Sequence, residues 1–68
     1  MTITDMRILF GDVHIDGKYC YVYSVFNECV ELYKKSMISD NMVYVGDFDN
    51  TSDCVRYIET IRNIYKED

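Results

Sequence analysis

Alternating oxygen-bearing side chains in one short stretch form the pattern in this chain that most suggests chemistry. They are Asp47, Asp49, Thr51 and Asp53. Ligands at alternate positions are typical of a calcium-binding loop, which also needs glycine at its sixth position and glutamate at its twelfth. This chain has Ser52 and Ile58 at those positions. We therefore do not expect a calcium-binding loop of that type.

The same segment, Asp47-Phe48-Asp49-Asn50-Thr51, resembles the first motif, DxDxT, of the haloacid dehalogenase superfamily. The resemblance implies a nucleophilic Asp47, an acid/base Asp49 and a magnesium ion between them. It covers five residues of 68, and seventeen residues after Thr51 are too few for the family's larger sheet and remaining ligands. A metal-dependent enzyme that uses the Asp47/Asp49 turn is kept as an alternative. The main expectation is a turn that caps the following helix, with no catalytic residue and no cofactor.

One histidine and three cysteines are the other candidates for chemistry. His14 would have to serve any histidine-based dyad, and Asp12 could orient it, but no nucleophile in a recognisable context accompanies them. The spacings of Cys20, Cys29 and Cys54 match no zinc finger or knuckle. An odd number of cysteines also differs from the paired framework of small secreted domains. The sequence therefore predicts no metal site and a reducing, cytoplasmic setting, which would be the host cytoplasm for a viral protein.

Size and charge limit the classes of partner. The 68 residues, 49% of them apolar, are enough for one small domain (1–68) with a thin core. Twelve acidic residues against seven basic ones give a net charge of −5 with no basic run, which disfavours direct binding to nucleic acid or to a membrane surface. The charge suits a basic partner, such as a protein surface that normally grips nucleic acid. We expect no signal peptide and no membrane span.

The composition also suggests an origin. The chain has no Ala, Pro, Trp or Gln but seven Ile, seven Tyr and eight Asp. Ala and Pro use G/C-rich codons, whereas Ile, Tyr, Asn and Lys use A/T-rich ones. Our hypothesis is an A/T-rich genome and a viral or phage accessory protein, with chance in a short sequence as the alternative.

Hydrophobic spacing predicts the element order β-β-α-β-α. Strands are expected at residues 6–15, 18–24 and 42–48, and helices at 27–38 and 53–66. Asp16-Gly17 is typical of a tight hairpin turn. The predicted fold is an α+β domain, a three-stranded sheet with both helices packed on one face.

The hairpin turn predicts a register in which Ile15 faces Lys18 and His14 faces Tyr19. Alternation then puts aliphatic side chains under the helices and aromatic ones on the open face. Tyrosine is enriched in binding surfaces, so this open face is the predicted partner-binding site. Its residues are Phe10, Asp12, His14, Tyr19, Tyr21, Tyr23 and Tyr44. The alternatives are that these rings pack beneath the helices or serve only cross-strand packing.

A second predicted surface is an acidic patch around the ends of the strand at 42–48 and the start of the last helix. It contains Asp40, Asp47, Asp49 and Asp53, and could mimic the charge of a nucleic acid. Together these features predict a non-enzymatic protein-binding module, such as an inhibitor of a host nuclease or defence complex. The alternative is a structural module whose aromatic face closes a homodimer.

Overall fold

The computed structural model describes residues 1–66 as two helices and a four-stranded antiparallel sheet. The strands follow one another across the sheet in the order β1-β2-β3-β4. The α+β class is confirmed, with four strands in place of the expected three. The elements are α1 (Ile3–Phe10), β1 (His14–Asp16), β2 (Tyr19–Ser24), β3 (Cys29–Lys35), β4 (Met42–Phe48) and α2 (Thr51–Tyr65).

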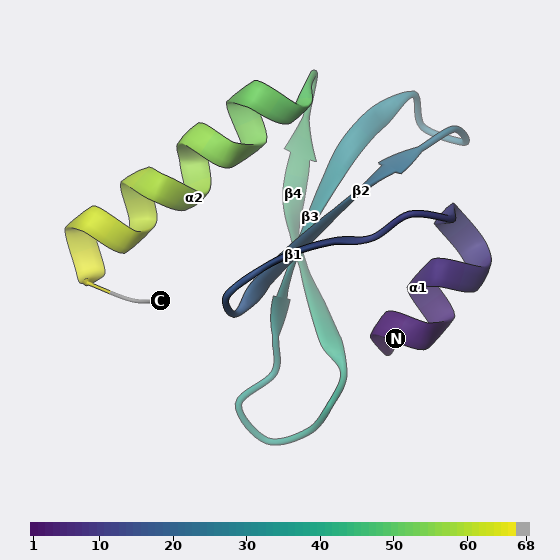
Figure 1. The fold of residues 1–68 in the computed structure, drawn as a ribbon, viewed down its shortest axis with the longest axis horizontal. Coiled ribbons are helices and arrows are strands. Elements are labelled where there is room, and N and C mark those ends of the chain that lie inside the picture. The colour runs from purple at the N-terminus through teal and green to yellow at the C-terminus, as the bar shows by residue number, and fades with distance from the viewer. Residues whose placement is uncertain (67–68) are drawn as a thin grey trace.

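The two helices lie on opposite sides of the sheet (Figure 1). Each one closes its own core against a different set of alternating strand residues. The core under α1 contains Met6, Cys20, Val22, Tyr33 and Met42. The core under α2 contains Tyr19, Val30, Leu32, Cys54 and Ile58. The expectation of both helices on one face is therefore wrong, because both faces of β2 and β3 carry apolar side chains that need cover.

The first helix replaces the first half of the strand expected at residues 6–15. Thr2 and Asp5 form a capping box: the Asp5 amide donates to Thr2 Oγ1 and the Thr2 amide donates to Asp5 Oδ2, each at 3.2 Å. Met6 faces the sheet and is fully buried. The helix ends at Gly11, whose φ of 84° few other residues adopt.

The third strand lies where a helix was expected at residues 27–38. β3 runs between β2 and β4, and helices cover both of its faces. Glu31 and Tyr33 on one face, and Val30 and Leu32 on the other, are therefore all buried. Such a run loses the alternation that marks a half-exposed strand, and its apolar residues also fit a helical spacing. The helix prediction is wrong for this reason.

The first hairpin has a register two residues away from the expected one. His14 pairs with Tyr21 and Asp16 pairs with Tyr19, so the turn falls on Gly17 and Lys18. Because side chains alternate with a period of two, this shift leaves every β1 and β2 residue on its predicted face.

The C-terminal elements agree with the sequence. β4 has the expected bounds, with a register irregularity opposite Leu32 and Tyr33. The second helix was expected at residues 53–66 and is found two residues earlier at its start, at Thr51–Tyr65. Asn50 caps it by accepting a 2.9 Å bond from the Asp53 amide. Arg62 near its end reaches the β1–β2 turn, with Nη2 2.7 Å from Asp16 Oδ1.

Candidate binding surface

An aromatic hollow lies where α2 leaves one corner of the sheet uncovered. Exposure increases along β2 from Tyr19, buried under α2, through half-buried Tyr21 to Tyr23, which is 54% exposed. A cavity of about 270 Å³ opens at this corner. We call it the aromatic hollow, and its lining residues are Phe10, Asp12, His14, Tyr21, Tyr23, Val25, Val30 and Thr51.

Two of the lining rings stack on each other. The imidazole of His14 and the phenol of Tyr21 stack across the β1–β2 pair, with centroids 5.1 Å apart and planes 17° apart. A stacked pair of this kind stabilises the β1–β2 edge beside the hollow. Tyr23 and Val25 form the exposed rim. Phe26, the next residue along the β2–β3 turn, is 76% exposed.

The charge at the hollow is negative. Asp12 is exposed and contributes the carboxylate of the lining. None of the lining residues is a lysine or an arginine. A cation–π contact already occurs on the same sheet face, where Lys34 Nζ lies 5.6 Å from the Tyr19 ring centroid. The hollow is therefore an aromatic site with an acidic side.

The structure brings most of the predicted partner-binding residues together and separates two of them. Five of the seven line the hollow: Phe10, Asp12, His14, Tyr21 and Tyr23. Tyr19 does not lie on an open face, because α2 packs over it. Tyr44 pairs with Tyr33 and therefore points to the opposite, α1-bearing face, where it is 53% exposed.

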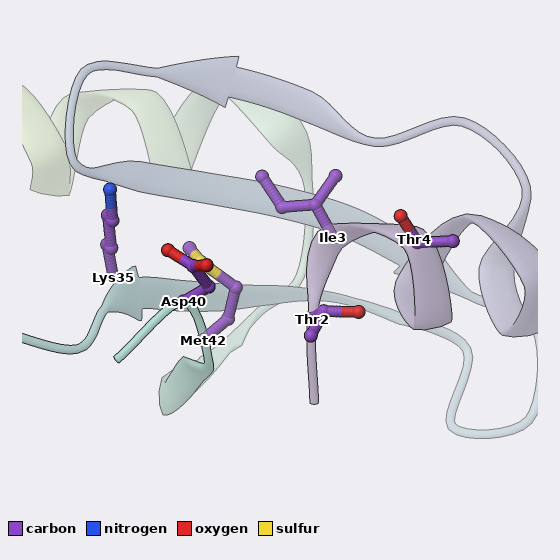
Figure 2. Close-up of a pocket in the computed structure, with 6 residues that line it drawn as sticks. All are labelled: Thr2, Ile3, Thr4, Lys35, Asp40 and Met42. Carbon is purple, nitrogen blue, oxygen red and sulfur yellow. The ribbon is translucent and has the colours of Figure 1, made fainter. Parts of the chain in front are cut away.

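The predicted acidic patch is divided between the two ends of β4. Asp47, Asp49 and Asp53 lie at its C-terminal end and in the first turn of α2. Asp40 lies at the other end, in a shallow cavity beside the start of α1. Figure 2 shows its carboxylate beside Met42, with Thr2 and Ile3 on the helix side and Lys35 across the cavity. The four carboxylates therefore do not form one surface.

Sequence reasoning missed a carboxylate–tyrosine cluster between β3 and β4. Its two pairs are Tyr33–Glu31, with a 2.8 Å bond, and Tyr44–Asp47, with a 2.7 Å bond, in which each phenol donates to a carboxylate. Glu31 is buried and also accepts a 2.7 Å bond from Asn27 Nδ2. The alternation of residues 29, 31 and 33 would have indicated this cluster if β3 had been recognised as a strand.

The cluster also contains the residues best placed to hold an ion. Within the described part of the chain, Cys29, Glu31 and Asp47 bring one ligand atom each to within 4.8 Å of one another. Asp49 and Asp53 are not part of this group. Burial raises the pKa of the Cys29 thiol, and the carboxylates of Asp47 and Glu31 raise it further. The thiol is therefore protonated at neutral pH, and a bound metal would have to displace that proton.

The histidine and cysteines do not converge. Cys20 is buried under α1 and Cys54 lies in α2 on the other side of the sheet. His14 stacks on Tyr21 at the edge strand. The three cysteines are unpaired thiols.

The fold is a small three-layer α+β arrangement, and the hollow is an aromatic cavity with an acidic side at a corner of the sheet. The chain matches no protein-family model, no curated protein and no solved structure. Among residues 1–66, no helix combines the length and the apolar character needed to cross a membrane.

Proposed function

We propose that this chain is a non-catalytic protein-binding module that docks a basic segment of another protein into its aromatic hollow. The observation that carries the proposal is the convergence of Phe10, His14, Tyr21 and Tyr23 on one open corner of the sheet. Large, half-polar rings around a desolvated pocket are the usual energetic centres of protein interfaces. Each ring is held by a strand or a helix end, so little order is lost on binding.

Charge supports a basic partner. The protein has a net charge of −5, and the hollow has a carboxylate and neither lysine nor arginine in its lining. Complementary charge speeds encounter and selects against acidic partners. A protein surface that normally grips nucleic acid has this character. The form of this function that we favour is an inhibitor of such a protein, such as a viral or phage accessory protein directed at a host nuclease or defence complex. A reducing cytoplasm is the compartment that suits three free thiols.

Site-specific photocrosslinking tests the docking site. p-Benzoylphenylalanine in place of Tyr23, at the rim of the hollow, or in place of Phe26, in the adjoining β2–β3 turn, should crosslink one partner in cells that produce the protein. The same group in place of Tyr44 is a matched control, because Tyr44 and Tyr23 are 53% and 54% exposed but lie on opposite faces. Equal yields of the same partner from all three positions would contradict docking at the hollow.

A homo-oligomeric structural module is the second candidate. β4 is an outer strand of the sheet and exposes Val43, Tyr44 and Val45. An outer strand of this kind can pair with a second copy. Sedimentation equilibrium measures the association state directly. A monomer at high micromolar concentration would eliminate this candidate, whereas a dimer weakened by Val43→Lys would support it.

A further inference from the structure

We infer that the aromatic hollow is a receptor for one cationic side chain, an arginine guanidinium, presented by the partner's basic segment. This inference rests on the function proposed above and names the chemistry that the hollow recognises. It depends on three properties of the lining residues: their rings, their carboxylate and the size of the space between them.

The rings provide a surface that attracts cations. Four aromatic side chains line the hollow, and two of them, His14 and Tyr21, stack nearly parallel to each other. A cation over an aromatic face is attracted by the ring quadrupole. Arginine is preferred to lysine at such a face because its planar guanidinium stacks on the ring and is more weakly hydrated.

The carboxylate of Asp12 favours a positively charged side chain as the guest, the group that enters the hollow. It lies in a lining that has neither lysine nor arginine, and His14 is the one basic side chain there. An apolar guest would desolvate this carboxylate without giving it a partner, which costs free energy. An anionic guest would be repelled. A guanidinium satisfies it with charge-assisted hydrogen bonds while its plane rests on the rings.

The hollow is large enough to take one side chain. Its volume is about 270 Å³, just below the range of about 300–1,000 Å³ typical of small-molecule sites. The exposed rim residues Val25 and Tyr23 then contact the backbone or neighbouring side chains of the guest segment.

Nuclear magnetic resonance titration with two short peptides tests this inference. The peptides are blocked at both ends and identical except for one position, which is arginine in one and the neutral isostere citrulline in the other. We expect saturable shifts of the Asp12, His14, Tyr21 and Tyr23 amide signals with the arginine peptide, and none with the citrulline peptide. Equal shifts with both peptides would overturn the inference.

Two variants that each remove one negative charge distinguish a direct contact with Asp12 from the effect of the protein's net charge. Asp12→Asn should weaken binding of the arginine peptide about tenfold, the size expected for a lost hydrogen bond to a charged group. Asp40→Asn removes the same charge at the far end of β4 and should weaken binding less than twofold. Both carboxylates are exposed, so neither variant removes core packing. Equal losses for the two variants would overturn the inference.

The two proposals fail in different ways. A partner crosslinked at position 23, combined with no effect of the arginine peptide, would overturn the guanidinium receptor and support the proposed function. Binding of the arginine peptide in the hollow, combined with no partner crosslinked at position 23 or 26, would support the receptor and overturn the proposed function.

Discussion

The rings of His14 and Tyr21 stack between the first two strands, with centroids 5.1 Å apart. This pair matters because β1 is an edge strand of only three residues. Beyond its backbone pairing with β2, the stack and the contact of Arg62 with Asp16 help to hold this side of the sheet. The stacked pair therefore both lines the aromatic hollow and stabilises the edge strand.

Replacing the histidine should loosen this edge. His14→Ala removes the stacked pair and should lower the free energy of unfolding by about 1 kcal/mol, the usual value of an aromatic pair. His14→Phe keeps a ring on Tyr21 and should retain most of that free energy. Urea denaturation of the two variants measures the difference. Equal stability of His14→Ala and His14→Phe would show that the stack contributes nothing.

Removing the buried carboxylate should cost more. Glu31→Ala leaves the phenol of Tyr33 and the amide of Asn27 without their acceptor. We expect a loss of roughly 2 kcal/mol in the free energy of unfolding, because an unsatisfied buried donor keeps its desolvation penalty. Relief of repulsion with Asp47 offsets part of the cost. Glu59→Ala, on the exposed side of α2, is the control and should change the free energy by less than about 0.5 kcal/mol.

The tyrosine–carboxylate bonds should make stability depend on alkaline pH. The hydrogen bond to Asp47, followed by burial, raises the pKa of Tyr44 from 10.0 to about 12. Burial, followed by the bond to Glu31, raises the pKa of Tyr33. A pKa that is higher in the folded state stabilises the fold fully below pH 10, and this contribution is lost as the pH rises from 10 to about 12.

Ultraviolet titration and unfolding measurements at several pH values test this prediction. In native protein, phenol ionisation should lag behind that of an unfolded control. Tyr44→Phe should reduce the fall in stability between pH 10 and about 12. An unchanged pH profile in Tyr44→Phe would mean that the bond to Asp47 does not form in solution.

Two of the cysteines should be unreactive until the protein unfolds. Cys20 and Cys54 are 0% exposed, and burial raises the pKa of each thiol to about 11. A thiol is nucleophilic as the thiolate, so neither should react with a disulfide reagent at neutral pH. Mass spectrometry of labelled protein, with and without urea, locates the modified residues. Rapid labelling of Cys20 or Cys54 in the absence of urea would contradict the burial of these thiols in the two cores.

Sequence patterns predicted the elements whose signals are local. β4 and α2 have clear periodicity, and Asn50 is a strong helix cap. The face on which each β2 side chain lies was also predicted, since a two-residue change in hairpin register moves no side chain to the other face. Five of the seven predicted contact residues therefore meet in one hollow.

The remaining features depend on tertiary contacts, which a short stretch of sequence does not reveal. β3 is covered on both faces, which removes the alternation expected of a strand. Tyr19 is buried because α2 crosses that face, and Tyr44 points away because β4 pairs with β3. The helix at Ile3–Phe10 had a local signal, the Thr2–Asp5 capping box, but the β-favouring residues after it obscured that signal.

The affinity of a purified, crosslinked partner for two tyrosine variants tests the central claim most directly. Tyr23→Ala should raise the Kd at least tenfold, as expected for an aromatic centre of an interface. Tyr44→Ala, equally exposed on the other face, should leave the Kd within twofold of the wild-type value. A Tyr23→Ala protein that binds as tightly as wild type would contradict docking at the aromatic hollow.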